Sequence, residues 1–455
     1  MNSDTPQSAR VVICGAGIAG VSTAFHLTRL GVSDIVVVDA RPPLTLTSDK
    51  STECYRNWWP SNPMVSFMSR SIDLLEAYAL ESGNRFSLSR RGYLYVTASI
   101  PQLDSMTHQA AAISQLGAGD IRNFRNSSAG YEPAALDGYE APVDGADIFR
   151  TGEALREAFD FVSGDAVGGI HVRRAGWLSA QQLGAWMIEE TIEAGVTYVQ
   201  GAVTNVSTDE VGVRSITIDG VTSVTCKNFV NAAGPLARDV GSLLGTAVPI
   251  TSEIHQKVSF KDHKGAFPRH APMVIWNDPQ RIDWEAETRK FLVEEARYEV
   301  MDELPAFVHG RPEGGRDSEW ALGLWEWNTK STHSPTWPLE DDPLYPELVV
   351  RGLSTMIPQM ATYQEALPEH TVDGGYYTKT IENLPLVGPI GPKGSFICAA
   401  LSGYGIMAAC AAGELAAAHI SGAPLPPYAQ AFSVDRYDDP QYVRSIRSIN
   451  TTGQI

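Results

Sequence analysis

Near the start of the chain, two short apolar runs flank a segment with helical spacing. Residues 11–14 and 35–38 are continuously apolar, and between them Val21, Ala24 and Phe25 recur at the three- and four-residue intervals of one helix face. Strands that lie under helices on both faces of a parallel sheet have this unbroken apolar pattern. The pattern therefore predicts a β–α–β unit at the start of the chain.

The next part of the chain continues this alternation and then loses it. A helical face with Ile72, Leu75 and Tyr78 is followed by residues 93–97, which have the composition of a strand. Residues 99–147 are mixed in character and rich in loop-forming residues. We expect a long helix, a strand and then a largely irregular stretch.

A capped helix and a hairpin follow. Residues 175–179 end in a serine that can cap the helix predicted after it. Two alternating strands, 211–218 and 223–230, are separated by Asp219-Gly220, a dipeptide typical of tight hairpins. These signals predict a return to regular α/β structure.

Residues 250–371 differ from what precedes them, because short aromatic and β-branched runs alternate with Pro, Gly and charged turns. We interpret this part as a second domain built on an antiparallel sheet. Its strand-like stretches are residues 258–260, 273–276, 291–293 and 320–327. The last third of the chain returns to glycine-rich loop and helix, so we expect distant segments to complete the first domain.

Composition and charge narrow the classes of function. The chain has 455 residues, 43% hydrophobic and 19% charged, which is typical of a globular protein with a large core. A formal net charge of −18 repels phosphate backbones and anionic lipid surfaces. We therefore expect a small-molecule partner, and neither nucleic acid nor a membrane.

The cysteines and the apolar segments favour a cytoplasmic protein. Five widely spaced cysteines without any C-x-x-C support neither a disulfide framework nor a metal site. Residues 1–10 lack the pattern of a cleavable signal. The apolar stretch 396–420 is interrupted by glycines and Glu414, so we do not expect it to span a membrane.

A glycine fingerprint occurs at the turn of the predicted β–α–β unit. Gly15-x-Gly17-x-x-Gly20 follows the first strand and opens the helix, and Asp39 ends the next strand. Gly15 permits a tight turn, Gly17 lets the backbone approach a pyrophosphate, and Gly20 allows close packing of helix and strand. Asp39 can accept hydrogen bonds from ribose hydroxyls. The sequence therefore predicts a dinucleotide site, without separating FAD from NAD.

Two later segments are suited to the same ligand. Residues 231–237 follow a strand and are small enough to pass close to a dinucleotide. Residues 401–405 precede a helix, whose free N–H groups and positive dipole end favour an anionic flavin edge. Taken alone, each segment is also compatible with an ordinary turn or helix start.

Together these blocks resemble the FAD-dependent glycine/D-amino-acid oxidase superfamily, which includes sarcosine oxidases, pipecolate oxidases and dimethylglycine dehydrogenases. The resemblance runs from residue 11 to about residue 420, and it is most specific at the fingerprint, at 231–237 and at 377–388 leading into 402–405. It implies FAD as cofactor and removal of a hydride from the carbon beside an amine nitrogen. The imine product then hydrolyses, as oxidative deamination or N-dealkylation.

The resemblance also implies the fold. We expect an α/β, Rossmann-like FAD-binding domain with a discontinuous parallel sheet and an α+β substrate-binding domain with a mainly antiparallel sheet. The FAD-binding domain is expected at residues 1–98, 151–249 and 371–425, the substrate-binding domain at 99–150 and 250–370, and a C-terminal tail at 426–455.

Residues 47–56 resemble the loop that lies near the flavin in sarcosine oxidases, and this places Arg56 where those enzymes keep an arginine for the substrate carboxylate. A guanidinium is suited to bidentate pairing with a carboxylate. A surface arginine is the alternative that the sequence leaves open. The cofactor residues expected from the resemblance and the fingerprint are Gly15, Gly17, Ile18, Ala19, Gly20, Asp39, Ala40, Arg41, Ser48, Lys50, Ser51, Val203, Ala233, Gly234, Gly403, Tyr404, Gly405, Ile406 and Met407.

Three positions depart from the resemblance. Gly375 stands where sarcosine oxidases bond a cysteine to the flavin, so we expect noncovalent FAD. Met407 stands in place of a second carboxylate-binding lysine. If residues 320–327 carry the oxygen-activating lysine and a nearby histidine of the family, those positions are Gly323 and Trp327. We expect a bulky or cationic amine, and not glycine or sarcosine, as substrate.

An aromatic box around a cationic or bulky amine is the expected substrate site, because cations bind well over aromatic faces. A core position is the alternative for each aromatic residue. With Arg56, the expected substrate-binding residues are Tyr55, Trp58, Trp59, Trp325 and Met407, and the expected catalytic residues are Arg56, Lys50, Tyr404 and Trp327.

A positive charge near the flavin would help oxygen to accept electrons. We expect Lys50 to supply it, with Lys257, Lys379 or the protonated amine as alternatives, and we expect a slow oxidase. A dehydrogenase with another acceptor, a flavin monooxygenase suggested by Gly164-Asp165, and a non-catalytic flavin-binding protein remain open, as does the oligomeric state.

Overall fold

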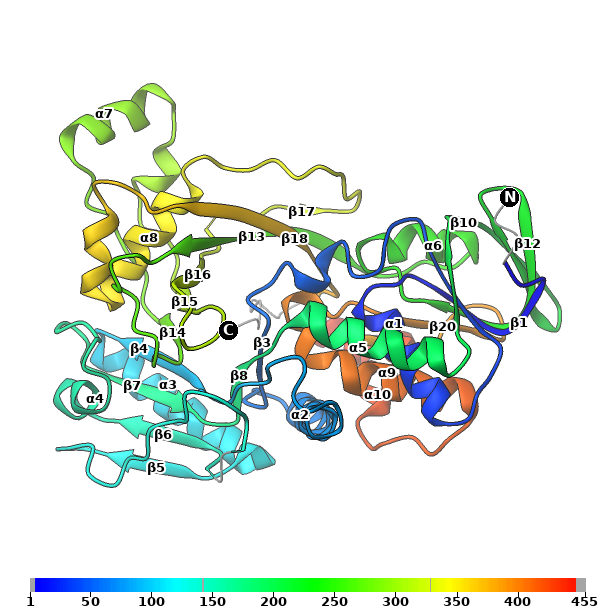
Figure 1. The fold of residues 1–455 in the computed structure, drawn as a ribbon, viewed down its shortest axis with the longest axis horizontal. Helices are drawn as coiled ribbons and strands as arrows, with labels where there is room; N and C mark the ends of the chain where they lie inside the picture. Colours follow the sequence, from blue (N-terminus) through cyan, green and yellow to red (C-terminus); the bar gives the residue numbers. More distant parts are fainter. Residues whose placement is uncertain (1–4, 141–142, 328, 447–455) are drawn as a thin grey trace.

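The structure is a computed structural model that describes residues 5–140, 143–327 and 329–446. Two large sheets lie toward opposite ends of the long axis of the molecule, and the long strands β13 and β18 extend from one end toward the other (Figure 1). The chain crosses repeatedly between the two sheets, so each sheet collects strands from distant parts of the sequence.

The first sheet has a parallel centre. Strand β1 pairs in parallel with β2 on one side and with β12 on the other, as the apolar runs predict. The hairpin of β11 and β12 turns at Asp219 and Gly220, both with positive φ, which confirms the predicted turn. Its strands are β1 (Ser8–Cys14), β2 (Ile35–Asp39), β9 (Thr197–Gln200), β10 (Val203–Asp209), β11 (Gly212–Ile218), β12 (Thr222–Asn231), β19 (Leu386–Pro389) and β20 (Ser395–Ala399).

Helices from both ends of the chain pack together beside this sheet. Ser22 donates its hydroxyl to the Ala409 carbonyl at 2.8 Å, and a Cβ at Gly413 would lie 2.3 Å from Ser22 Oγ. Small residues therefore allow helices α1 and α9 to approach each other closely. The helices that surround the sheet are α1 (Ile18–Arg29), α2 (Asn62–Ser82), α5 (Ala180–Glu193), α6 (Ala237–Leu243), α9 (Gly405–Ser421), α10 (Ala429–Phe432) and α11 (Pro440–Ile446).

The second sheet is mainly antiparallel and has ten strands within the residues that the structure describes. Helix α8 (Tyr345–Met356) covers one of its faces with buried Val349 and Leu353. The strands are β4 (Tyr93–Thr97), β5 (Ile121–Phe124), β6 (Ala146–Phe149), β7 (Gly168–Val172), β13 (Thr251–Lys261), β14 (Met273–Trp276), β15 (His309–Pro312), β16 (Trp320–Leu324), β17 (Ser331–Thr332) and β18 (His370–Lys379).

The predicted fold class is confirmed: a Rossmann-like α/β sheet and a second, mainly antiparallel sheet. The expected domain boundaries need correction. Strands β4, β7 and β18, expected in the first domain, belong to the second sheet, because β4 pairs with β14 and β18 pairs with β13 along ten residues. Residues 447–455 of the expected C-terminal tail lie outside the described residues.

Two secondary-structure expectations were wrong. The stretch expected to be irregular contains α3 (Ile100–Ile113), which Ser99 caps by accepting a hydrogen bond from the Gln102 N–H. Residues 291–293, expected as a strand, lie in α7 (Ala286–Glu294), where Leu292 is the buried position. Short apolar runs do not distinguish strand from helix, and the charged neighbours here favour the helix. A further short helix is α4 (Gly152–Ala158).

The apolar stretch at residues 396–420 forms most of strand β20 and most of helix α9. In the described part of the chain, every helix is too short or too polar to cross a bilayer.

His171 on β7 makes the stability of the fold depend on pH. Its Nε2 lies 2.9 Å from the Arg91 carbonyl and its Nδ1 lies 3.1 Å from the Tyr131 hydroxyl, which suits the neutral ring. Burial lowers the pKa of His171 to about 3, whereas an unfolded histidine titrates near 6.5. As pH falls from 7 to 5, this histidine becomes protonated in the unfolded chain but stays neutral in the folded protein. The free energy of unfolding therefore falls.

We expect this histidine to contribute a loss of roughly 2 kcal/mol in the free energy of unfolding between pH 7 and pH 5. Urea denaturation of the wild type and of His171→Asn at both pH values measures it. The variant is expected to show the smaller pH dependence, and equal pH dependence in the two proteins would contradict the assignment.

Candidate functional site

The turn after β1 brings the backbone very close to the end of β12. Gly15 has φ +116°, and a Cβ there would lie 2.3 Å from the Ala232 carbonyl oxygen. A Cβ at Gly20 would lie 1.9 Å from the Gly15 oxygen. Both glycines are therefore required by close approach of the chain to itself. Gly17 precedes α1 and faces Ser48 Oγ, which accepts a hydrogen bond from the Ile18 N–H at 3.0 Å.

Asp39 ends β2 with its carboxylate fixed beside this turn. One oxygen accepts from the Ala16 N–H at 2.8 Å and the other from the Arg41 N–H at 3.0 Å. Each carboxylate oxygen keeps a lone pair for a further donor, such as a ribose hydroxyl.

A long cavity runs from Asp39 past the N-terminus of α1 to the N-terminus of α9. Its walls come from five separate segments of the sequence. The lining residues are Gly15, Gly17, Ile18, Ala19, Asp39, Arg41, Pro42, Leu44, Thr45, Leu46, Thr47, Ser48, Ser51, Ala232, Ala233, Gly234, Pro235, Tyr376, Tyr377, Thr378, Cys398, Ala399, Ala400, Leu401, Ser402, Gly403, Gly405 and Ile406.

The far end of this cavity lies where the two sheets meet. Tyr377 on β18 packs so closely against the turn before α9 that a Cβ at Gly403 would lie 2.4 Å from its ring. The other side of the Tyr377 ring stacks on His255 of β13, with ring centres 4.0 Å apart. Helix α9 begins at Gly405, so its unpaired N–H groups and its positive dipole end face the cavity.

Arg56 lies on β3 (Cys54–Arg56), which pairs with β8 (Ala175–Trp177) just beyond the cavity-lining loop. It is only 5% exposed. Its guanidinium lies 4.4 Å from the centre of the Trp59 ring and 5.6 Å from that of Tyr93, and its Nε donates to the Trp58 carbonyl. Trp59 in turn contacts Tyr404 edge to face at 5.1 Å. These contacts fix the plane of a buried cation near the start of α9.

A chain of charged groups lies on the second sheet next to Tyr377. His255 Nδ1 pairs with Glu326 at 2.5 Å, its Nε2 lies 3.6 Å from Glu253, and Lys379 pairs with Glu253 at 2.7 Å. Burial alone would lower the pKa of His255, but the two carboxylates outweigh it and raise the pKa above its usual value. The neighbouring His255 and Lys379 side chains lower the pKa of Glu253 to about 2.

Comparison with known proteins identifies this fold and cavity. A family model described as FAD dependent oxidoreductase (DAO) matches residues 10–419. The chain belongs to this family. The predicted family, with FAD as its cofactor, is confirmed.

Solved structures share the fold at low sequence identity. L-proline dehydrogenase from P. horikoshii superposes with a TM-score of 0.73 at 18% identity and covers 95% of this chain and 99% of its own. Glycine oxidase from Geobacillus kaustophilus gives 0.72 at 16%, covering 94% and 98%. L-amino acid deaminase from Proteus vulgaris gives 0.72 at 13%, covering 95% and 98%.

A curated mammalian relative matches part of the chain. The mitochondrial pyruvate dehydrogenase phosphatase regulatory subunit of Mus musculus is 23% identical over 257 residues, which is 55% of this chain. The match spans only 25% of that relative, so this chain corresponds to a fraction of its length.

The residues of the cavity fit FAD. Small residues at Gly15 and Gly17 leave the backbone open to a pyrophosphate at the start of α1, and Asp39 faces the position of a ribose. The start of α9 supplies backbone donors at the other end. When bound, FAD supplies the two-electron acceptor, and the protein supplies its position and electrostatic surroundings.

Most of the cofactor residues expected from the sequence line this cavity, but six do not. Gly20 packs against Gly15 instead, Val203 lies at the edge strand β10, and Tyr404 donates its hydroxyl to the Asn383 carbonyl at 2.6 Å. The others outside the lining are Ala40, Lys50 and Met407. The lining also includes residues that we did not expect, above all Tyr377.

Lys50, expected beside the flavin, points to the second sheet. Its Nζ donates to Asp373 on β18 at 2.8 Å. The backbone of Gly375 lies against the same side chain, since a Cβ there would be 2.9 Å from Lys50 Cβ. The ammonium of Lys50 is thus held at the boundary of the two sheets by a carboxylate.

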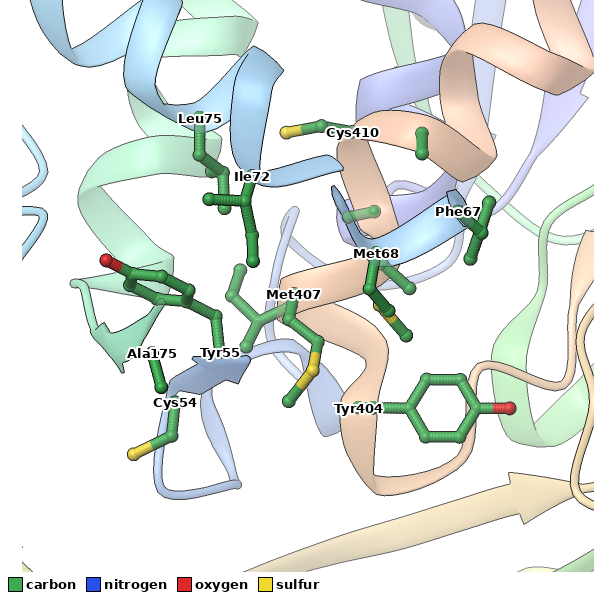
Figure 2. Close-up of a cluster of buried hydrophobic side chains, with 14 of the residues drawn as sticks. Cys54, Tyr55, Phe67, Met68, Ile72, Leu75, Ala175, Tyr404, Met407 and Cys410 are labelled. Carbon is green, nitrogen blue, oxygen red and sulfur yellow. The ribbon is translucent and has the colours of Figure 1, made fainter. Parts of the chain in front are cut away.

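Tyr55 and Met407 are corrected to core positions, because both are buried in the apolar cluster between α2 and α9 (Figure 2). Tyr55 is fully buried, and its hydroxyl donates to the Ser89 carbonyl at 3.0 Å. On the short strand β3, Tyr55 and Arg56 point to opposite sides. Trp58 is also buried in this cluster.

The expected aromatic box does not assemble, because Trp325 and Trp327 pack on α8. A Cβ at Gly352 would lie 2.7 Å from the Trp325 ring, and Trp327 stacks on Tyr345 at 5.2 Å. Gly323 faces the same helix, since its added Cβ would meet Val349 at 2.6 Å. The roles expected for Trp325 and Trp327 are therefore withdrawn, and Glu326 between them points to His255 instead.

Sequence reasoning missed the polar residues of β15. His309 and Arg311 are both buried, and Arg311 Nε donates to the Thr52 carbonyl at 2.8 Å. Burial lowers the pKa of His309. The signal was the period of two in His309-Gly310-Arg311, which puts both polar side chains on one face of a strand.

Proposed function

We propose that this enzyme oxidises an amine that carries a carboxylate, by hydride transfer from the carbon next to the nitrogen to the flavin. Hydrolysis of the resulting imine then completes an oxidative deamination or an N-dealkylation. The observation that supports this proposal is Arg56, a buried cation held between Trp59 and Tyr93 directly after the cofactor-lining loop. A buried guanidinium is suited to a carboxylate, and the aromatic rings are suited to the rest of an amino acid.

The printed names of the structural neighbours support the same chemistry. Proline, glycine and other amino acids are named as the compounds on which these proteins act. Arg56 is the cation that we propose for the substrate carboxylate, because it lies beside two aromatic rings directly after the cofactor-lining loop. Met407 stands where the family keeps a second carboxylate-binding lysine, so we propose an amino acid with a bulky group, in preference to glycine or sarcosine.

A panel experiment tests this function. Purified holoenzyme is assayed with primary, secondary and tertiary amines and with amino acids, with a redox dye as acceptor. Turnover of amino acids with large side chains, at least tenfold above glycine and sarcosine in kcat/KM, is the expected result. Preferential turnover of the two small substrates would contradict the choice of substrate class.

The proposed electron acceptor is oxygen, at modest speed. The Lys50 ammonium that we expected to assist it is bonded to Asp373. Stopped-flow reoxidation of the reduced enzyme decides this point. A rate no higher than that of free reduced flavin would identify a dehydrogenase with another acceptor.

A non-catalytic flavin-binding role is the second candidate, because the curated relative is named as a regulatory subunit. If this candidate is correct, the protein binds one FAD per chain and dithionite reduces that FAD, but no amine in the panel does.

We expect all of the FAD to be released by acid precipitation. The position of the family's linking cysteine is Gly375, and Cys398, which lines the cavity, has its thiol pKa raised by burial to about 12. A protonated thiol is a poor nucleophile for attachment to the flavin. Absorbance of the supernatant and the pellet measures the result, and yellow colour retained in the washed pellet would contradict it.

A further inference from the structure

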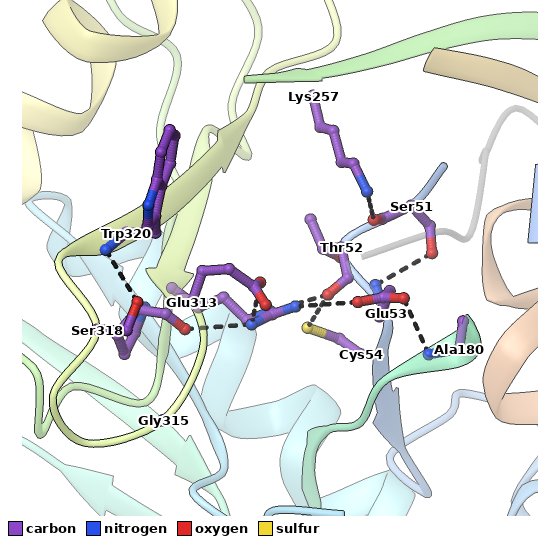
Figure 3. Close-up of polar contacts among 12 residues, drawn as sticks. Ser51, Thr52, Glu53, Cys54, Ala180, Lys257, Glu313, Gly315, Ser318 and Trp320 are labelled. Atoms are coloured by element: carbon purple, nitrogen blue, oxygen red, sulfur yellow. Dashed lines mark hydrogen bonds and ion pairs between the residues drawn. The ribbon is translucent and has the colours of Figure 1, made fainter. Parts of the chain in front are cut away.

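Two buried cations of the second sheet reach the loop that lines the cofactor cavity. Lys257 on β13 donates its ammonium to the Ser51 carbonyl at 3.0 Å (Figure 3), and Arg311 on β15 donates Nε to the next carbonyl, that of Thr52, at 2.8 Å. Their side chains are almost completely buried, with Lys257 at 9% and Arg311 at 0% exposure. Two consecutive peptide carbonyls are thus turned toward the second sheet.

This arrangement sets the direction of the N–H groups in the same peptides. In a planar trans peptide the carbonyl and the N–H point in opposite directions, so the Thr52 N–H points away from Lys257. The Glu53 N–H donates to Ser51 Oγ at 3.1 Å. The Thr52 N–H has no acceptor among residues 5–140, 143–327 and 329–446, although Thr52 is only 8% exposed.

Buried N–H groups without a partner are rare in folded proteins. Ser51, whose carbonyl belongs to this peptide, lines the cavity that fits FAD. An oxygen or nitrogen atom of the bound cofactor can therefore supply the acceptor that the Thr52 N–H lacks. We infer that Lys257 and Arg311 are positioning residues that orient the loop so that the Thr52 N–H donates to the bound FAD, and that the Lys257 charge favours the reduced cofactor.

The two cations contribute differently. Both cations act on the carboxylate of Glu53, and Arg311 in addition pairs with Glu313 at 2.7 Å, so we assign Arg311 mainly to loop geometry. Lys257 polarises the peptide whose N–H is directed to the cofactor. A flavin gains negative charge on reduction, and a buried cation one peptide away stabilises that charge more strongly than it would in water.

The reduction potential of the bound FAD tests this inference. Lys257→Met removes the charge with little change in side-chain length, and Lys261→Met is the matched control on the same strand, with a half-exposed ammonium 3.8 Å from Glu319. We expect Lys257→Met to favour the reduced form about tenfold less, a fall of about 30 mV for two electrons. Lys261→Met is expected to match the wild type.

Sulfite provides a second readout, because it adds to the oxidised flavin ring and leaves a negatively charged adduct. We expect at least tenfold weaker sulfite binding in Lys257→Met, and recovery toward the wild type in Lys257→Arg. Unchanged potential and sulfite affinity in Lys257→Met would overturn the inference.

If Lys257→Met does not retain FAD, Lys257→Gln decides, since it keeps an N–H donor for the Ser51 carbonyl and lacks the charge. The inference requires a lowered potential in that variant, and a wild-type potential would overturn it. These readouts use no amine, so they can fail or succeed independently of the substrate proposed above.

Discussion

Gly17→Val is expected to give a folded protein that binds FAD at least 100-fold more weakly than the wild type. Gly17 lines the cavity at the start of α1, and an added Cβ would already lie 3.3 Å from Ser48 Oγ. The two further methyl groups of valine would fill the space through which a pyrophosphate approaches the helix N-terminus. Titration of the apoprotein with FAD, followed by flavin fluorescence, measures the change.

Gly164→Ala is the matched control. Gly164 has no atom within 4 Å of an added Cβ and no positive φ. It should bind FAD like the wild type, and circular dichroism should show both variants folded. If Gly17→Val bound FAD as tightly as this control, the cavity at the start of α1 would not hold the pyrophosphate.

Arg56→Met is expected to lower the second-order rate constant for flavin reduction by the amino acid by about 100-fold or more. A charge-assisted, bidentate pair with a carboxylate contributes about 2–3 kcal/mol or more when it is buried. The effect should be specific, because an amine of the same shape without a carboxylate makes no such pair. Anaerobic stopped-flow reduction with both compounds measures the difference.

Arg90→Met serves as a comparison, because Arg90 is a second arginine with a largely buried side chain, and it pairs with Glu76 and not with the loop. FAD content and thermal stability of the Arg56 variant show whether the fold is intact, since Arg56 also packs on Trp59. If the rate constant fell equally for the amino acid and for the amine without a carboxylate, Arg56 would maintain the structure of the site and would not recognise the substrate.

The dinucleotide part of the site could be predicted because local sequence determines it. Gly15 has a positive φ, Gly20 packs against the Gly15 carbonyl within the same turn, and Asp39 follows from the end of the adjacent strand. The Asp219-Gly220 hairpin is equally local. In each case the residue type and its spacing specify the geometry, without knowledge of distant parts of the chain.

The substrate side could not be predicted in the same way, because it depends on which face of a strand points inward. Trp325 and Trp327 were expected in the substrate site, yet they pack on α8, while Glu326 between them faces His255. Lys257 and Arg311 reach one loop only because β13 and β15 belong to the same sheet. Their meeting depends on strand order, which a single sequence does not specify.

Single-turnover reduction shows whether bound FAD takes a hydride from the carbon beside an amine nitrogen. Oxygen-free holoenzyme is mixed with a bulky amino acid carrying hydrogen or deuterium at that carbon, and the flavin absorbance is followed. We expect complete bleaching of the flavin, slower by a factor of at least two with deuterium. Flavin that dithionite reduces but no amine or amino acid bleaches would contradict it.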